Sequence, residues 1–295
     1  MLAHHLVKAI RPPTRLILVG DPDQLPSVGA GNVLRDLLNS GRVTVCRLTQ
    51  IFRQDQDSLI VSNAHRILAG GEPSFPESGD LDQDFYFFRA EDPASTCDRL
   101  VDVVTHRIPP TFGFRWEDDV QVIAPMYRGE CGVDVLNERL REAQGVGGRE
   151  LVRGRERWRI GDRVIHTRND YDKKVFNGDM GRIIHVADGA KLTVRYPEQD
   201  VVYENAEISD LRPAFAITVH RSQGGEFPVV VLPLVTQHFM MLRRNLLYTA
   251  VTRARKLVVL VGSRRALRMA IDNDVEDKRE SALCQRLQAL TEKTP

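Results

Sequence analysis

The chain has 295 residues, of which 42% are hydrophobic and 27% charged, and its formal net charge is +1. This composition is typical of a globular chain long enough for two domains, and it excludes a fibrous or wholly disordered protein. A net charge near zero also excludes attraction to nucleic acid over the whole surface, so any such site must be local.

The cysteines favour a reducing, cytoplasmic setting. Cys46, Cys97, Cys131 and Cys284 are far apart and form no CxxC pair, so neither a zinc site nor a redox couple is predicted, and no metal ligand is assigned. No stretch reaches the roughly 20 apolar residues of a membrane span, so no membrane association is expected.

Apolar, strand-like runs alternate with helical patterns along the chain. In order, the patterns predict a strand at 15–20, helices at 33–38, 57–71 and 95–108, a strand at 119–126, a helix at 131–145, a strand at 228–234, a helix at 244–255, a strand at 256–263 and a last helix at 276–292. Strands that alternate with helices predict an α/β fold with a parallel sheet covered on both faces.

Residues 149–212 differ in character, because helical periodicity gives way to short β-like pieces separated by turn dipeptides such as Asn177-Gly178. We interpret this segment as a small β-barrel inserted into the α/β domain. Within it lies a row of alternating arginines, Arg153, Arg155, Arg157 and Arg159. If the row is extended, all four share one face, which suits a phosphate backbone, with Trp158 on the other face; the alternative is a solvated loop.

The segment Gly20–Pro26, "GDPDQLP", follows the first strand-like run and carries Asp21 and Gln24. A side-chain amide both donates and accepts hydrogen bonds, so it can reach a γ-phosphate or a lytic water. A structural turn is the alternative interpretation. Arg53 follows Phe52, a possible packed anchor, and could act on a transferring phosphate or form a surface ion pair.

Two later segments also carry candidate chemistry. Gly224-Gly225 permits close backbone approach to a ligand, and Glu226 could accept a ribose hydroxyl. Arg253 is predicted on a helix, pointing across a cleft. The alternatives are a simple turn for the glycines and a helix-face salt bridge for Arg253.

In order and spacing these segments resemble the RecD-like helicases of superfamily 1, the 5′→3′ branch of DNA translocases, essentially end to end. The segment 16–37 looks like motif III, 48–54 like motif IV, 214–234 like motif V and 244–262 like motif VI, while 161–183 resembles the SH3-like insertion of that family.

The resemblance implies two RecA-like domains that bind ATP with Mg²⁺ between them and couple its hydrolysis to movement along single-stranded DNA and to duplex unwinding, in DNA repair or recombination. It implies catalytic roles for Gln24, Arg53 and Arg253, nucleotide contacts from Asp21, Gly224 and Glu226, and DNA contacts from Arg168, Asn169, Tyr171, Asn177, Thr218 and His220. Tyr171 is expected to stack on a base or to belong to the barrel core.

One element of that family is missing from the sequence. No Gly-Lys dipeptide occurs, so the phosphate loop GxxxxGK[ST] is absent, and nothing before Leu16 supplies the Asp-Glu pair that holds magnesium. We therefore expect residues 1–45 to be a remnant of the first RecA-like domain, 46–148 with 213–295 to be the second, and 149–212 to be the insertion.

Four expectations follow from this division. The chain alone has little ATPase or helicase activity, its natural partner is the missing N-terminal helicase portion, it is monomeric, and its first 45 residues expose apolar surface. The alternative function is a non-catalytic single-strand-binding or regulatory module, and a more distant one is a plain nucleotide-binding α/β protein.

Overall fold

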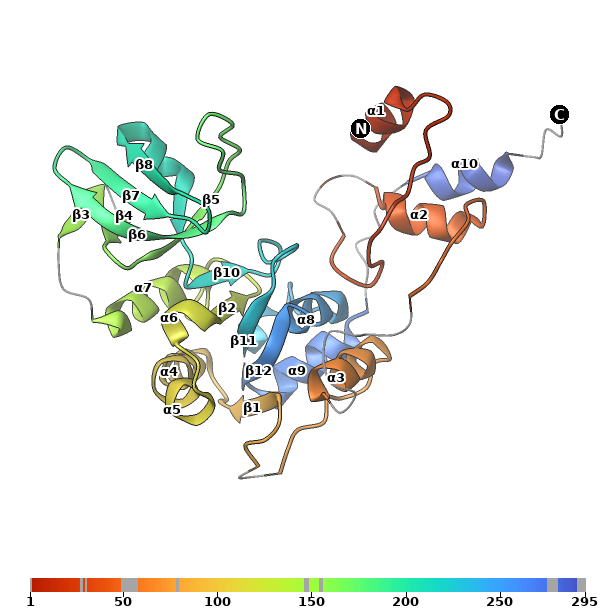
Figure 1. Cartoon of the computed structure of the whole chain (residues 1–295). Coiled ribbons are helices and arrows are strands. Elements are labelled where there is room, and N and C mark those ends of the chain that lie inside the picture. The colour runs from red at the N-terminus through yellow and green to blue at the C-terminus, as the bar shows by residue number, and fades with distance from the viewer. Residues whose placement is uncertain are drawn as a thin grey trace. The chain divides into compact units, whose positions relative to one another are not determined.

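The computed structural model describes residues 2–26, 29, 31–48, 58–77, 80–145, 149–153, 156–274 and 281–290 (Figure 1). The chain divides into two compact units, one formed by residues 1–52 with 274–295 and the other by 53–273. Arg53 and Arg155 lie outside the described residues. Among the residues that are described, no helix combines the length and apolar character needed to cross a membrane.

The larger unit is built on a five-stranded sheet in which all neighbouring strands are parallel. Its order is β1 (Phe85–Arg89), β12 (Ala254–Gly262), β11 (Phe227–Leu234), β2 (Val120–Ala124) and β10 (Ala216–Thr218). The central strands are buried on both faces over most of their length because they are predominantly apolar, as is typical of parallel sheets. The predicted α/β class is therefore confirmed.

Helices cover both faces of this sheet (Figure 1). On one side lie α4 (Pro93–Asp102), α5 (Ile108–Phe112), α6 (Trp116–Asp119) and α7 (Val133–Gln144), and on the other α3 (Leu59–Leu68), α8 (Arg244–Val251) and α9 (Arg264–Asp272). Alternate strand residues such as Val229 and Val231 pack in the core with α4 and α7. The predicted helix at 95–108 is present within a helical stretch from Pro93 to Phe112, in which a π-helical segment at Val103–Arg107 lies between α4 and α5.

The inserted β domain consists of a hairpin, β3 (Glu150–Arg153) with β4 (Glu156–Arg159), and an antiparallel five-stranded sheet. The sheet order is β8 (Asp200–Glu204), β7 (Lys191–Arg195), β6 (Met180–Ala187), β5 (Arg163–His166) and β9 (Leu211–Pro213), and a 3₁₀ turn at Asn205–Asp210 links β8 to β9. Its core is organised around Trp158, which is fully buried.

The row of arginines does not form one strand. The hairpin turns between Arg153 and Glu156, which pair across it, so Arg153 lies on a different strand from Arg157 and Arg159. On β4 the prediction that Trp158 and the arginines lie on opposite faces holds, because Trp158 is buried while Arg157 is exposed.

The smaller unit contains α1 (Leu2–Ala9), α2 (Val33–Ser40) and α10 (Leu283–Ala289). Helices α2 and α10 pack together, and the Arg42 Nη2 donates to the Gln288 carbonyl at 3.1 Å. The sequence interpretation grouped residues 274–295 with the second domain, whereas in the structure they cluster with residues 1–52. The reason is this contact between α10 and α2.

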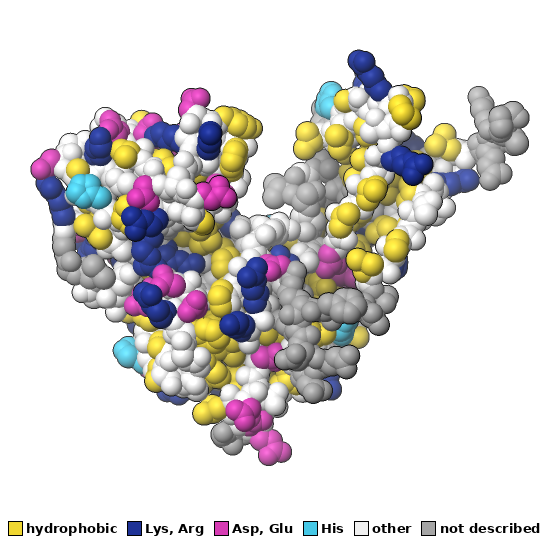
Figure 2. Space-filling model, viewed as in Figure 1, with side chains coloured by type: hydrophobic (Ala, Val, Ile, Leu, Met, Phe, Trp, Pro, Cys, Tyr) yellow, Lys and Arg dark blue, Asp and Glu magenta, His cyan; other side chains and the backbone are white. Residues whose placement is uncertain are grey.

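The buried strand predicted at 15–20 is not present. Leu16–Val19 has no strand conformation, and 82% of Ile17 and 91% of Val19 are exposed. A strand needs a hydrogen-bonded neighbour, and no strand pairs with these residues within the described part of the chain. The predicted exposure of apolar surface is confirmed, since Leu2, Leu6, Val7 and Leu48 are also exposed and hydrophobic side chains are spread over this unit in Figure 2.

Candidate functional site

A tight loop joins the end of β10 to the start of β11. Thr218 is the last residue of β10 and only 5% exposed; its Oγ1 accepts from the Arg221 N–H at 3.3 Å, and its carbonyl accepts from the Ser222 N–H at 3.1 Å. The loop therefore begins with a helical turn, on which His220 is exposed. Gly224 then takes a φ of +81°, a conformation in which glycine avoids steric strain.

Arg253 packs against the far end of the same loop. Its Nη1 donates to the Gly225 carbonyl at 3.2 Å and its Nε donates to the Thr249 carbonyl at 3.2 Å. Only 7% of the residue is exposed. The structure thus brings Arg253 together with the segment Gly224–Glu226, although they are 28 residues apart.

The prediction that Arg253 lies on a helix is wrong. Helix α8 ends at Val251, and Arg253 occupies the turn before β12. The physical reason is strand pairing, because the Arg253 carbonyl already accepts from the Phe227 N–H at 2.9 Å, beside the first pair of the β11–β12 ladder. Its guanidinium is nevertheless held in one place by the backbone carbonyls it contacts.

Glu226 forms an ion pair with Arg255, whose Nε lies 2.9 Å from its Oε2. Glu226 directly follows Gly225, whose carbonyl accepts from Arg253, so the residues at the amino ends of β11 and β12 include a carboxylate, guanidiniums and glycine backbone. Such a set can bind hydroxyls and phosphate oxygens of a ligand.

Asp21 and Gln24 lie in the smaller unit and form a compact turn. The Asp21 carboxylate accepts from the Asp23 N–H at 3.0 Å and from the Gln24 Nε2 at 3.0 Å. This is the structural-turn alternative, in which a short acidic side chain closes the turn on its own backbone. Arg53 is outside the described residues, so its position relative to either unit is not given.

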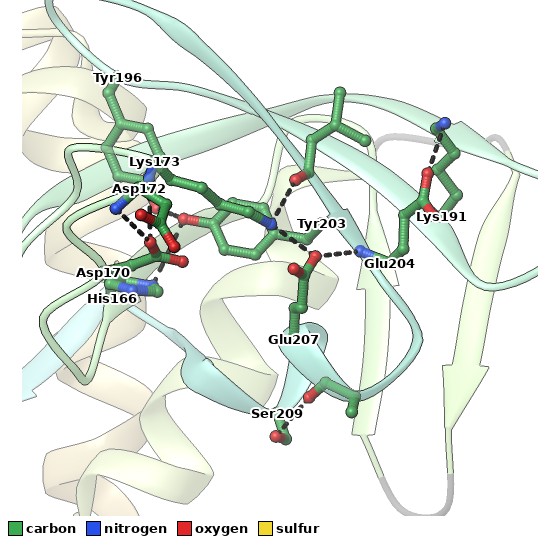
Figure 3. A network of polar contacts seen from close by, with 12 residues as sticks. His166, Asp170, Asp172, Lys173, Lys191, Tyr196, Tyr203, Glu204, Glu207 and Ser209 are labelled. Carbon is green, nitrogen blue, oxygen red and sulfur yellow. Dashed lines mark hydrogen bonds and ion pairs between the residues drawn. The ribbon is translucent and has the colours of Figure 1, made fainter.

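The residues of the β domain that are predicted to contact a DNA strand lie on one loop, residues 167–179 between β5 and β6. Figure 3 shows the polar contacts that hold this loop. The Asp170 carboxylate accepts from the Asp172 and Lys173 N–H groups, and Asp170 also bridges to Val175. Lys173 in turn pairs with Glu207 at 2.5 Å and donates to the Val202 carbonyl at 3.0 Å. The loop is therefore fixed at its centre to β8 and to the 3₁₀ turn.

Tyr171 projects from this fixed loop and is 75% exposed, so it is not a core residue. Its ring meets that of Phe176 edge to face at 5.9 Å, and Phe176 is 43% exposed. Asn169 and Asn177 support the loop, since the Asn169 Oδ1 accepts from the Asn177 N–H at 3.0 Å. Arg168 lies 3.4 Å from Asp210 with a largely exposed side chain.

Beneath the loop lies a buried polar chain that the sequence analysis did not single out. The Tyr196 and Tyr203 hydroxyls are 2.7 Å apart, and the Tyr203 hydroxyl is 3.4 Å from His166 Nδ1. Burial lowers the pKa of His166. Tyr203 and His166 lie on β8 and β5 and Tyr196 directly follows β7, and nothing in their residue type separates them from ordinary core positions.

A second buried histidine, His238, follows β11 and gives a pH-dependent prediction. It is 1% exposed, neither ring nitrogen has a hydrogen-bond partner among the residues that the structure describes, and burial lowers its pKa to about 4. The unfolded chain takes up the proton first, so stability is full above about pH 6.5 and falls by about 1.4 kcal/mol per pH unit from there towards pH 4.

We expect His238→Leu to remove this component of the acid sensitivity. The measurement is the free energy of unfolding in urea at several pH values, compared between the two proteins. Equal slopes below pH 6.5 would show that His238 does not titrate in this way.

No group of three or more His, Cys, Asp or Glu side chains within the described ranges is arranged to hold a metal ion. Comparison with known proteins matches three family models. They are an AAA domain over residues 1–81, the ATP-dependent RecD-like DNA helicase SH3 domain over 135–196 and the UvrD-like helicase C-terminal domain over 213–261.

The ATP-dependent RecD2 DNA helicase of Deinococcus radiodurans is 36% identical over 286 residues, covering 96% of this chain and 37% of that protein. The RecBCD enzyme subunit RecD of Mycolicibacterium smegmatis is 32% identical over 286 residues, covering 90% of this chain and 48% of that protein. The chain thus spans less than half the length of these two relatives. A crystal structure of Pif1 helicase from Bacteroides in complex with ADP-AlF3 and ssDNA aligns with a TM-score of 0.49 at 20% identity, over 82% of this chain and 60% of that one.

Proposed function

The chain belongs to the RecD-like helicases, and from this membership we propose that it forms part of an ATP-dependent DNA helicase. In this proposal residues 53–273 contribute Arg253 and the Gly224–Glu226 segment to a bound nucleotide, and the β domain holds single-stranded DNA. The observation that carries the proposal is the contact between the Arg253 guanidinium and the Gly225 carbonyl, which joins two segments that each resemble a helicase motif.

The chemistry at this contact supports a nucleotide as ligand. The guanidinium of Arg253 is a planar donor suited to phosphate oxygens, and the Glu226 carboxylate can accept from ribose hydroxyls. ATP with Mg²⁺ is the nucleotide form we propose. Nucleotide contacts from Asp21, Gln24 and Arg53 are proposed separately, from the family resemblance of their segments.

The loop 167–179 supports single-stranded DNA as the second ligand. It presents the exposed aromatic ring of Tyr171 on a backbone fixed by Asp170 and Lys173. Because the loop is already ordered, little conformational entropy is lost when a base stacks on the ring. Thr218 and His220 are proposed to contact phosphate oxygens through a hydroxyl and an imidazole.

We propose the domain division inferred from the sequence, with 149–212 as the SH3-like insertion within a second RecA-like domain, except that residues 274–295 group with residues 1–52. We also propose that the 295-residue polypeptide turns over little ATP by itself. The sequence contains no GxxxxGK[ST] segment, whose backbone N–H groups and lysine would hold the phosphates.

Nucleotide binding by the purified chain tests the role of Arg253. A fluorescent ATP analogue with Mg²⁺ is expected to bind weakly, and Arg253→Ala is expected to weaken binding by at least about tenfold, the scale of one lost charge-assisted contact. Lys256→Ala, which removes a nearby cation from β12, is the matched control and should leave binding unchanged. Unaltered binding in Arg253→Ala would contradict the assignment, and robust ATP hydrolysis by the wild-type chain would contradict the expected lack of turnover.

A second function, a non-catalytic single-strand-binding module, is favoured by one observation. The loop 167–179 is anchored entirely within the larger unit and its exposed aromatic pair needs no nucleotide to be presented. Nucleotide-independent affinity for single-stranded DNA, together with no binding of the ATP analogue, would select this alternative.

A further inference from the structure

Arg163, the first residue of β5, reaches out of the β domain into the parallel sheet. Its Nη1 donates to the Val120 carbonyl at 2.7 Å and its Nη2 donates to the Gln121 Oε1 at 2.8 Å, both on β2. The side chain is partly buried, and burial lowers the pKa of Arg163 to about 10, so it remains charged at neutral pH. Its two terminal nitrogens each donate to an acceptor on β2, which offsets part of the cost of removing the charge from water.

Gln121 also contacts the chain segment that leads into β10. The residue is fully buried, and its Nε2 lies 3.2 Å from the Ala214 carbonyl and 3.1 Å from the Phe215 carbonyl. Ala214 in turn donates its N–H to the Arg163 carbonyl at 2.9 Å. A closed ring of hydrogen bonds therefore links β5, β2 and the residues immediately before β10.

A second arginine strengthens the same junction. The Arg182 Nη2 donates to the Glu117 carbonyl at 2.6 Å and to the Asp118 carboxylate at 2.5 Å, while its Nη1 donates to the Gly161 carbonyl at 2.8 Å. Helix α6 is thus tied to the turn before β5 and to β6. Two arginines from the β domain bind the α/β domain through fixed backbone acceptors rather than through mobile side chains alone.

The position of the junction gives it a consequence for ligand binding. β5 runs from Arg163 directly into the loop 167–179, and the segment held by Gln121 runs directly into β10, which ends at Thr218. The loop 167–179 and the loop after Thr218, both proposed to contact DNA, therefore start within a few residues of the same hydrogen-bonded ring. Two binding elements held at a fixed separation engage one ligand strand with a high effective concentration.

We propose that Arg163 is a positioning residue, which holds the loop 167–179 and the loop after Thr218 in fixed register so that a single DNA strand contacts both at once. This inference rests on the proposed function, in which both loops bind single-stranded DNA. The junction would thereby give the chain a higher affinity for long DNA strands than either loop has alone.

The test compares a short and a long oligothymidylate, of about 4 and about 15 nucleotides, which span one or both elements. Fluorescence anisotropy with the full 295-residue chain gives the two dissociation constants for wild type, Arg163→Met and Arg163→Lys. Arg195→Met is the matched control, because Arg195 is an exposed arginine of the same β domain whose side chain pairs with Asp200 inside that domain. Circular dichroism melting establishes that each variant is folded.

Arg163→Met is expected to weaken binding of the long strand by about tenfold or more and to leave binding of the short strand unchanged. Arg163→Lys retains the charge and one donor to β2, so its affinity for the long strand is expected to lie between those of the methionine variant and the wild type. Arg195→Met is expected to change the affinity for the short and the long strand by the same small factor. If the methionine variant does not fold, the lysine variant carries the test.

Two results would overturn the inference. One is a folded Arg163 variant with wild-type affinity for the long strand, and the other is equal weakening for both lengths, which indicates local damage to one loop. Should the wild-type chain bind neither strand, the proposed function itself fails, and with it the basis of the inference.

Discussion

Replacing Trp158 with alanine is expected to lower the free energy of unfolding of the β domain by about 3–5 kcal/mol, the cost of removing a fully buried large side chain and leaving a cavity. Trp158 is 0% exposed and belongs to one core cluster with Val164, Ile183 and Leu211, which come from β5, β6 and β9. The loop 167–179 is attached to two of these strands, so binding of single-stranded DNA should be lost as well. Urea unfolding followed by circular dichroism measures the first effect.

Trp158→Phe is the matched control for this experiment. The Trp158 Nε1 is buried and has no hydrogen-bond partner within the described ranges, so phenylalanine removes an unsatisfied donor while keeping an aromatic ring in the core. We expect a loss below about 2 kcal/mol for this variant, with DNA binding retained. An alanine variant that unfolds at the same urea concentration as the wild type would show that Trp158 does not hold this core together.

Tyr171→Ala is expected to weaken binding of single-stranded DNA by about 1–3 kcal/mol, the usual contribution of one base stacked on an aromatic ring. The side chain is 75% exposed and its backbone is fixed through Asp170, so the substitution removes the ring without altering the loop. Anisotropy titration of a labelled oligothymidylate gives the dissociation constant, and thermal melting should not change.

Tyr171→Phe separates stacking from hydrogen bonding at this position. Phenylalanine keeps the aromatic face and loses only the hydroxyl, so we expect affinity close to that of the wild type. Equal loss of affinity in both variants would indicate a hydroxyl contact instead of stacking. Wild-type affinity in the alanine variant would exclude Tyr171 from the interface.

The parallel sheet was predictable because its strands are built from long β-branched runs. The runs that became β2, β11 and β12 are apolar on both faces, which identifies central strands of a parallel sheet from sequence alone. The same signal misled at Leu16–Val19, where an equally apolar run has no strand to pair with among the described residues. Whether a segment forms a strand depends on the segments available to pair with it as much as on its own residues.

The proposed site residues stay predictions, but the contact that joins two of their segments could not be predicted from the sequence. Gly224 and Arg253 were identified from residue type and order, yet their contact through the Gly225 carbonyl depends on β11 and β12 being adjacent, which no local pattern encodes. The junction at Arg163 escaped prediction for the same reason. An arginine at the start of a short strand looks like a solvated residue until its partner on β2 is known.

The central claim is that this chain holds single-stranded DNA on its β domain, and a direct binding titration tests it. The measurement is the anisotropy of a labelled oligothymidylate of about 15 nucleotides, titrated with the 295-residue chain at two salt concentrations, with unlabelled duplex as competitor. The account predicts saturable binding that weakens with salt and with Tyr171→Ala, and that duplex displaces poorly. Absence of binding at low salt, or binding that Tyr171→Ala leaves intact and duplex removes readily, would contradict it.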